Sequence, residues 1–331
     1  MKLRTIYLRD LDLYPLIKGE SGETTNPQEG KCNNFNYRNT HHSPTPIYIM
    51  QHYTVSDCDN TIKLFTTNPT SAPVSAHFVI DRDGVIQVLI DPAYRAYHAG
   101  SGNLCMNSKL NPYIPEAEIK NDMNSWSIGI ENVNNGNEEF SLPQIQANIV
   151  LCQKLYQDYP VNPVLMIAHS DWAIGRKKDT GIFFPWEYFA NATEDLWCYD
   201  AGITTSFGIF PRKSDLDLRY DPNIVVSYDG RGVAMEDLEY IQNNLRELGY
   251  DIPESEIGTM GRVKAAIGDK TQASILAFRT HFSGDEIRED PVQRQAWSDL
   301  CANPENSVAK AILSQFNAND LACLGDMLDH L

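Results

Sequence analysis

The chain has 331 residues, 42% of them hydrophobic, and its 44 acidic and 27 basic side chains give a formal net charge of -17. This length is sufficient for two domains, each with its own hydrophobic core. The strongly acidic balance argues against a nucleic-acid partner and against a general affinity for anionic surfaces.

The N-terminal region, residues 1–45, is predicted to be an arm that precedes the first domain. Its start, MKLRTIYLRDLDLYPLIKG, is interrupted by charged residues and therefore lacks the apolar segment of an export signal. Residues 18–45 are rich in Gly, Asn, Thr and Ser, which is typical of loops. The sequence offers no stretch long and apolar enough to predict a transmembrane helix.

Two runs of β-favouring residues each carry one polar side chain that suits catalysis or metal binding. Residues 46–53, PIYIMQHY, carry His52 near their end, and residues 126–133, WSIGIENV, carry Glu131. Apolar runs of this length are typical of buried strands. Because the strands of one sheet can bring such side chains together, we treat His52 and Glu131 as candidates for one site.

A hairpin and a long helix are predicted beside these runs. In residues 76–91, two apolar runs flank Asp83-Gly84, a dipeptide that favours tight hairpin turns. Ser141 and Gln144 form a capping-box pattern, and apolar residues recur at helical spacing after them.

The seven cysteines are scattered and include no CxxC pair, so we expect reduced thiols, most of them buried.

The stretch from Val164 to Trp186, VLMIAHSDWAIGRKKDTGIFFPW, offers two more metal-competent side chains. An apolar, strand-like run ends on His169, and Asp179 follows on a loop that contains glycines. Imidazole and carboxylate are both standard zinc ligands. Their separation is too long for one helix face, so the loop must fold back on itself, which the glycines favour. Composition alone is equally compatible with a surface loop that carries unrelated charges.

Taken together, the three strand-like runs supply the ligand count of a catalytic zinc site. Such a site uses three protein ligands and leaves one position open for water. His52, His169 and Asp179 make that set, and Glu131 is then left as a candidate general base.

Four segments, in this order, resemble the zinc-dependent N-acetylmuramoyl-L-alanine amidases, the family that also includes phage T7-type lysozyme and the animal peptidoglycan recognition proteins. The segments are QHYT, SAHFVIDRDGVIQVLIDPAYRAYHAG, SIGIENVN and AHSDWAIGRKKDTGIFFPW, and they lie between about residues 40 and 190. The resemblance implies an α/β (α+β) fold in which helices flank a mixed central β-sheet, with zinc in a surface groove.

The resemblance also implies roles for individual residues. By motif match, the zinc ligands would be His52, His169 and Asp179, with Asp in the third place as in the bacterial branch. Glu131 would be the carboxylate that handles protons. Lys177 would be the cation that stabilises the oxyanion.

Two further residues are candidates for substrate contact. The resemblance places His98, in YRAYHAG, at the wall of the groove, although Tyr97 stands before it where Trp is usual. Arg176 is a candidate for binding the carboxylates of a stem peptide, although solvated surface charge is the more common role of such a residue.

After residue 228 the composition shifts to a pattern of amphipathic helices. Apolar residues at helical spacing predict one helix that ends at Gly249 and a second over about residues 271–282. The order helix, LGY, spacer and TQASILAFRTHF resembles the small peptidoglycan-binding domain appended to many wall hydrolases; the alternative is a generic helical packing domain. We therefore expect an arm over 1–45, a zinc amidase domain over 46–215, and over 229–331 an all-α domain with a C-terminal helix that increases retention on polymeric peptidoglycan.

These features predict zinc-dependent hydrolysis of the amide bond between N-acetylmuramic acid and L-alanine, in peptidoglycan or in muropeptides. The alternative is a non-catalytic peptidoglycan-recognition protein, but such relatives lose a ligand that this chain keeps. A zinc peptidase lacks support because the sequence has no HExxH motif. We expect a monomer. We expect the cell envelope, the periplasm or secretion, because of the two-domain architecture; the cytoplasm is the alternative, because no export signal is visible in the sequence.

Overall fold

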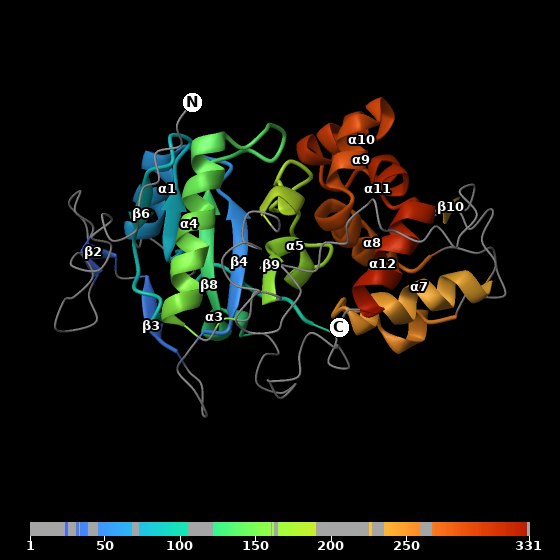
Figure 1. Ribbon diagram of the computed structural model, residues 1–331, viewed down its shortest axis with the longest axis horizontal. Helices are drawn as coiled ribbons and strands as arrows, with labels where there is room; N and C mark the ends of the chain where they lie inside the picture. The colour runs from blue at the N-terminus through green and yellow to red at the C-terminus, as the bar shows by residue number, and fades with distance from the viewer. Residues whose placement is uncertain are drawn as a thin grey trace. The chain divides into compact units, whose positions relative to one another are not determined.

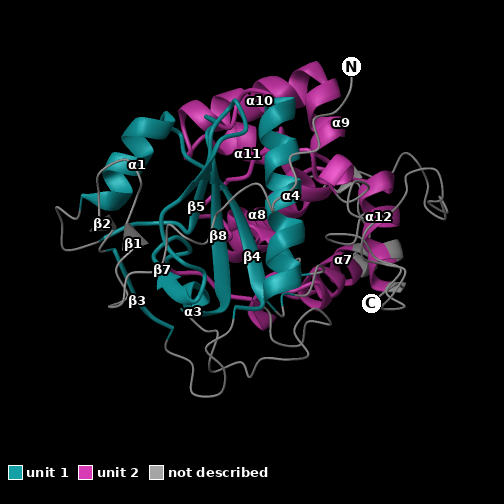
Figure 2. Ribbon diagram, turned by 60° about the vertical axis from the view of Figure 1, so that its left-hand side comes forward, with its two compact units in different colours: residues 1–100, 122–135, 140–166 teal, residues 101–121, 136–139, 167–331 magenta. Residues whose placement is uncertain are grey.

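The structure is a computed structural model. It describes residues 24–25, 31–32, 34–38, 46–67, 73–104, 122–159, 161, 165–189, 225–226, 235–258 and 267–329. Most of the predicted arm, and most of the segment that joins the two predicted domains, lie outside these residues. The chain divides into two compact units: unit 1 comprises residues 1–100, 122–135 and 140–166, and unit 2 comprises residues 101–121, 136–139 and 167–331 (Figure 2).

The central feature is a five-stranded mixed β-sheet with the strand order β6-β5-β8-β4-β9 (Figure 1). Strands β4 and β5 both pair in parallel with β8, whereas β5 pairs antiparallel with β6. The predicted hairpin is thus confirmed, and Gly84 in its turn has a φ of +87°, which favours glycine. The strands are β4 (Tyr48–Tyr53), β5 (Phe78–Ile80), β6 (Ile86–Val88), β8 (Ser127–Asn132) and β9 (Met166–Ala168).

Helix α4 (Leu142–Asp158) is the long helix predicted from the capping pattern. The Ser141 side chain accepts a hydrogen bond from the Gln144 backbone N–H at 3.3 Å, as predicted. The Gln144 side chain does not return to Ser141 as a full capping box requires; it donates to the carbonyl oxygens of Ile80 and Val133 at 2.9 and 3.2 Å. This residue therefore joins the helix to the sheet as well as marking its start.

The alternation of side chains along β4 and β8 separates a structural face from the face that carries His52. Asn148 of α4 donates to Gln51 of β4 at 2.9 Å and to the side chain of Asn132 of β8 at the same distance. His52 follows Gln51 and therefore points to the other face. Its register partner on β8 is Glu131, so both predicted site residues lie on the sheet face opposite α4.

Smaller elements complete unit 1 and the start of unit 2. On the His52 face, Phe65 of α1 packs in a core cluster with Val79 of β5. These elements are β1 (Thr24–Thr25), β2 (Lys31–Cys32), β3 (Phe35–Tyr37), α1 (Cys58–Thr66), β7 (Tyr94–Ala96), α3 (Met123–Trp126) and α5 (His169–Trp172).

The C-terminal part of unit 2 is helical, and it contains both helices predicted there. Its core includes the fully buried Trp297, and Phe278, whose ring centroid lies 5.4 Å from that of Phe316. Arg279 and Asp320 form a buried ion pair at 2.9 Å. The elements are β10 (Val225–Val226), α7 (Met235–Glu247), η3 (Glu254–Glu256), α8 (Asp269–Phe282), α9 (Gly284–Glu289), α10 (Pro291–Ala302), α11 (Ser307–Leu313), β11 (Phe316–Asn317) and α12 (Ala318–Asp329).

Four cysteines are free thiols in the structure: Cys58, Cys152 and Cys323 are buried, and Cys301 is partly exposed. Burial raises the pKa of the Cys58 thiol to about 12, and such a thiol is unreactive at neutral pH. The expected reduced thiols are thus found at these four positions. Within the described ranges, the helices lack the combination of length and apolarity that crossing a bilayer requires.

Candidate metal centre

His52 is held in one orientation by a chain of hydrogen bonds within unit 1. Its Nε2 lies 3.0 Å from Nδ1 of His98, and Nε2 of His98 lies 3.3 Å from the Ser127 hydroxyl. Since Ser127 donates its own proton to the Met123 carbonyl at 2.6 Å, a neutral His98 ring donates to Ser127 and accepts from His52. His52 therefore carries its proton on Nε2 and has a lone pair on Nδ1, the state that a metal ligand needs.

His98 lies against β8 at the position of a glycine. A Cβ atom built on Gly129 would lie only 2.4 Å from Cγ of His98. The His98 side chain is buried, at 9% exposure, and its bond to His52 makes it a support of that residue. The predicted contact between His98 and substrate stays a prediction.

His77 lies beside this chain and is fully buried. Its Nδ1 accepts from the Gly129 N–H at 2.9 Å, and its Nε2 lies 3.1 Å from the Tyr94 carbonyl and 3.1 Å from the Arg38 guanidinium. Burial, and then the charge of Arg38, lower the pKa of His77 well below its ordinary value of 6.5. His77, which directly precedes β5, is therefore a neutral, packed histidine.

The lowered pKa of His77 predicts a contribution to acid denaturation. The unfolded chain takes up a proton at this residue as the pH falls below about 6.5, and the folded chain does not, so the free energy of unfolding falls by up to about 1.4 kcal/mol per pH unit. We expect His77→Asn to be less stable at pH 7 but to lose stability less steeply between pH 6.5 and 5. Denaturant titrations of both proteins measure this difference. Equal slopes would show that the folded protein protonates His77.

His169 opens α5 directly after β9, and Asp179 returns to it at the end of the following loop. The Ser170 N–H donates to the Asp179 carbonyl at 2.8 Å, and His169 Nδ1 lies 2.9 Å from Asp179 Oδ2. Gly175 and Gly181 have φ angles of +78° and +79°. Glycine adopts this left-handed conformation without a steric penalty, so the predicted fold-back is confirmed.

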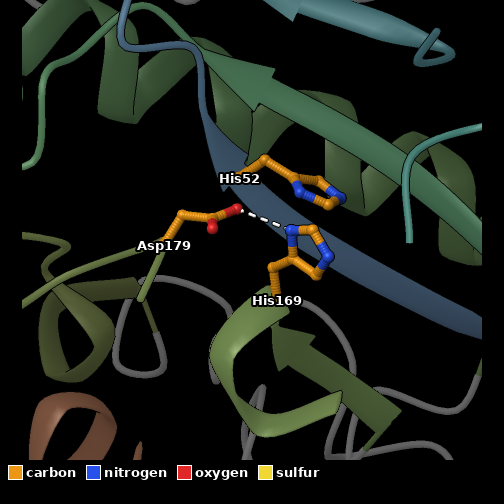
Figure 3. Close-up of side chains that lie close together, drawn as sticks. All are labelled: His52, His169 and Asp179. Atoms are coloured by element: carbon orange, nitrogen blue, oxygen red, sulfur yellow. Dashed lines mark hydrogen bonds and ion pairs between the residues drawn. The ribbon is translucent and has the colours of Figure 1, made fainter. Parts of the chain in front are cut away.

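Three buried side chains, those of His52, His169 and Asp179, come together in Figure 3. Each offers one ligand atom, and these atoms all lie within 4.8 Å of one another. Two imidazoles and a carboxylate are a standard ligand set of catalytic zinc sites, which keep a fourth position open. The donor set therefore fits zinc.

The remaining predicted residues differ in their surroundings. Glu131, the register partner of His52, is partly exposed. Arg176 donates from Nε and Nη2 to the Ser101 carbonyl at 2.9 and 2.6 Å, while the Lys177 side chain is exposed. The roles of all three stay predictions.

Sequence reasoning missed a buried cluster around Asp171. This carboxylate accepts from the Ala168 N–H at 2.8 Å, from His281 Nδ1 at 2.7 Å and from the Tyr250 hydroxyl at 3.0 Å. The sequence separations of 79 and 110 residues from Asp171 leave no periodic or motif signal for these contacts. The role of Asp171 as the centre of this cluster is therefore visible only in the folded structure.

Comparison with known proteins gives a family match to the central part of the chain. Residues 42–182 match a family model described as N-acetylmuramoyl-L-alanine amidase. The chain is 28% identical over 156 residues to the N-acetylmuramoyl-L-alanine amidase AmiD of Escherichia coli, which covers 45% of this chain and 54% of that protein. It is 31% identical over 116 residues to the 1,6-anhydro-N-acetylmuramyl-L-alanine amidase AmpD of Escherichia coli, and this match covers 35% of this chain and 56% of that protein. The chain thus spans about half the length of these relatives.

Solved structures share the fold over a longer range. A complex of Escherichia coli AmiD with an anhydro-N-acetylmuramic acid tripeptide substrate matches 93% of this chain and 97% of its own, with a TM-score of 0.57 and 19% identity. AmpDH3 from Pseudomonas aeruginosa matches 88% of this chain and 95% of its own, with a TM-score of 0.55 and 20% identity. At this identity the likeness is one of fold, whereas the family model rests on sequence. Residues 42–182 of this chain therefore form a domain of the N-acetylmuramoyl-L-alanine amidase family.

Proposed function

We propose that this protein is a zinc-dependent amidase that hydrolyses the bond between N-acetylmuramic acid and L-alanine in peptidoglycan or muropeptides. The observation that carries the proposal is the buried group of His52, His169 and Asp179 inside a domain of the amidase family. When bound in such a site, zinc supplies a water nucleophile at neutral pH and polarises the carbonyl that is attacked.

The chain's own residues would then divide the work as follows. His52, His169 and Asp179 hold the metal, and the His98 chain keeps His52 in the correct tautomer. Glu131 accepts a proton from the attacking water and passes it to the departing amine of L-alanine. Lys177 stabilises negative charge on the carbonyl oxygen of the lactyl group as its carbon becomes tetrahedral.

Two regions bear on substrate binding. Arg176 and His98 are proposed to contact the muropeptide, because both belong to segments that resemble the family's groove. Residues 229–331 are proposed to increase retention on polymeric peptidoglycan. A module of this kind raises the local concentration of substrate and adds no chemistry.

Digestion of two substrates tests the proposed activity. Purified sacculi and soluble muropeptides are incubated with the zinc-loaded protein, and the products are identified by mass spectrometry. We expect free stem peptides that begin with L-alanine, and we expect a chelator to abolish their release. Retention on sacculi without any release of peptide would instead indicate a recognition protein.

A further inference from the structure

We infer that Asp171 is a positioning residue through which the C-terminal helices hold the turn that carries His169, so that metal affinity depends on those helices. The inference rests on the proposed function, because it concerns the same metal ligands. It goes beyond that function by giving the helical region a part in building the metal site, in addition to any retention on peptidoglycan.

The turn at His169 is bridged by a hydrogen bond to the Asp171 side chain. Asp171 lies two residues after this ligand, in the same short helix α5, and its Oδ2 accepts from the Ala168 N–H at 2.8 Å. That bond ties the carboxylate to the backbone on the other side of His169. The position of the ligand's Cα is therefore set by how Asp171 is held.

Asp171 is held from the C-terminal helices at both of its oxygens. His281 of α8 donates from Nδ1 to Oδ2 at 2.7 Å, and the Tyr250 hydroxyl, which follows α7, donates to Oδ1 at 3.0 Å. His281 is itself fixed by stacking, with ring centroids 3.8 Å from Trp186 and 4.0 Å from Phe282. Hydrogen bonds to a buried carboxylate are among the strongest in proteins, because the charge is poorly solvated.

The C-terminal helices also hold the loop that carries Asp179, at residues on both sides of it. Lys178, which precedes Asp179, donates to the Leu300 carbonyl at 2.8 Å, at the C-terminal end of α10 where a helix favours a cation. Arg288 of α9 donates to the Ile182 carbonyl. All of these residues belong to unit 2, so the segment with His169 and Asp179 is built into the helical region.

Zinc affinity of full-length variants tests this inference. Asp171→Asn weakens two of the three contacts, and Tyr250→Phe removes one hydroxyl while leaving the ring. Groups that orient a ligand typically contribute about 10- to 100-fold to metal affinity. We expect the Zn²⁺ dissociation constant, measured by competition with a chromophoric chelator, to rise about tenfold in Asp171→Asn and less, in the same direction, in Tyr250→Phe. Excess zinc should restore the turnover of both.

Ser283→Ala is the matched control. The Ser283 hydroxyl also donates to a buried carboxylate of the helical region, Oδ1 of Asp320, at 2.5 Å, and this bond joins two residues that lie outside the segment carrying His169 and Asp179. Chemical unfolding of the metal-free proteins reports the general loss of stability in each variant. Positioning predicts that Ser283→Ala loses stability with an unchanged zinc dissociation constant, whereas Tyr250→Phe changes both.

The outcomes separate the two proposals. If wild-type protein binds one zinc and both Asp171 and Tyr250 variants bind it as tightly, the coupling is wrong and the proposed function stands. An equal loss of affinity in Ser283→Ala would also overturn it, since any weakening of the helices would then suffice. If wild-type protein binds no zinc, the ligand assignment and the coupling both fail.

Discussion

His169→Ala should yield a protein without stoichiometric zinc and without amidase turnover. The substitution removes one of the three proposed ligands and also the imidazole whose Nδ1 lies 2.9 Å from Asp179 Oδ2. Removing a group that only orients a ligand lowers metal affinity roughly 10- to 100-fold. The zinc affinity should fall by more than this in His169→Ala, because the substitution removes a proposed ligand itself. Elemental analysis of the dialysed variant measures the metal, and release of stem peptides measures turnover.

His77→Ala is the matched control for this experiment. It also removes a buried imidazole, but His77 bonds to Gly129 and does not belong to the ligand group. We expect it to be destabilised and yet to retain zinc. One zinc per chain in His169→Ala would show that the metal is held elsewhere.

Glu131→Gln should separate metal binding from catalysis. The amide is close in size to the carboxylate but cannot accept a proton, so turnover should fall by about 100- to 10,000-fold while zinc content stays at one per chain. Single-turnover hydrolysis of a soluble muropeptide, with zinc measured on the same sample, gives both quantities.

Glu139→Gln provides the comparison for that variant. Glu139 is a well-exposed carboxylate that forms an ion pair with Arg288 at 3.9 Å, so its neutralisation should leave turnover unchanged. Loss of zinc in Glu131→Gln would make Glu131 a metal ligand. Near-normal turnover would remove it from the mechanism.

Much of the candidate site could be predicted, because His52, Glu131 and His169 stand within or at the ends of strand-like apolar runs. His52 and Glu131 lie in β4 and β8, and the glycines around the basic residues of the loop indicated that Asp179 folds back towards His169. The register that sets His52 beside Glu131 could not be predicted, because parallel strands distant in sequence have no turn to fix their alignment.

The residues that hold the proposed ligands in place could not be predicted from the sequence, for a related reason. His98 and Asp171 act through hydrogen bonds to residues that are far away in the chain, and such contacts leave no periodicity. Lys178 is a further example. It stands in a basic run that suggests binding of an anion, yet its ammonium group bonds to a backbone carbonyl of α10.

Gly129, which packs against the His98 ring, has a consequence for mutational surveys of this protein. Gly129 has no side chain to take part in chemistry, but even alanine there would force the His98 ring away and release the proton on His52 from its acceptor. A saturation library scored by cell-wall lysis should therefore rank position 129 with the metal ligands. Position 129 should therefore tolerate no substitution, although glycine has no functional group of its own.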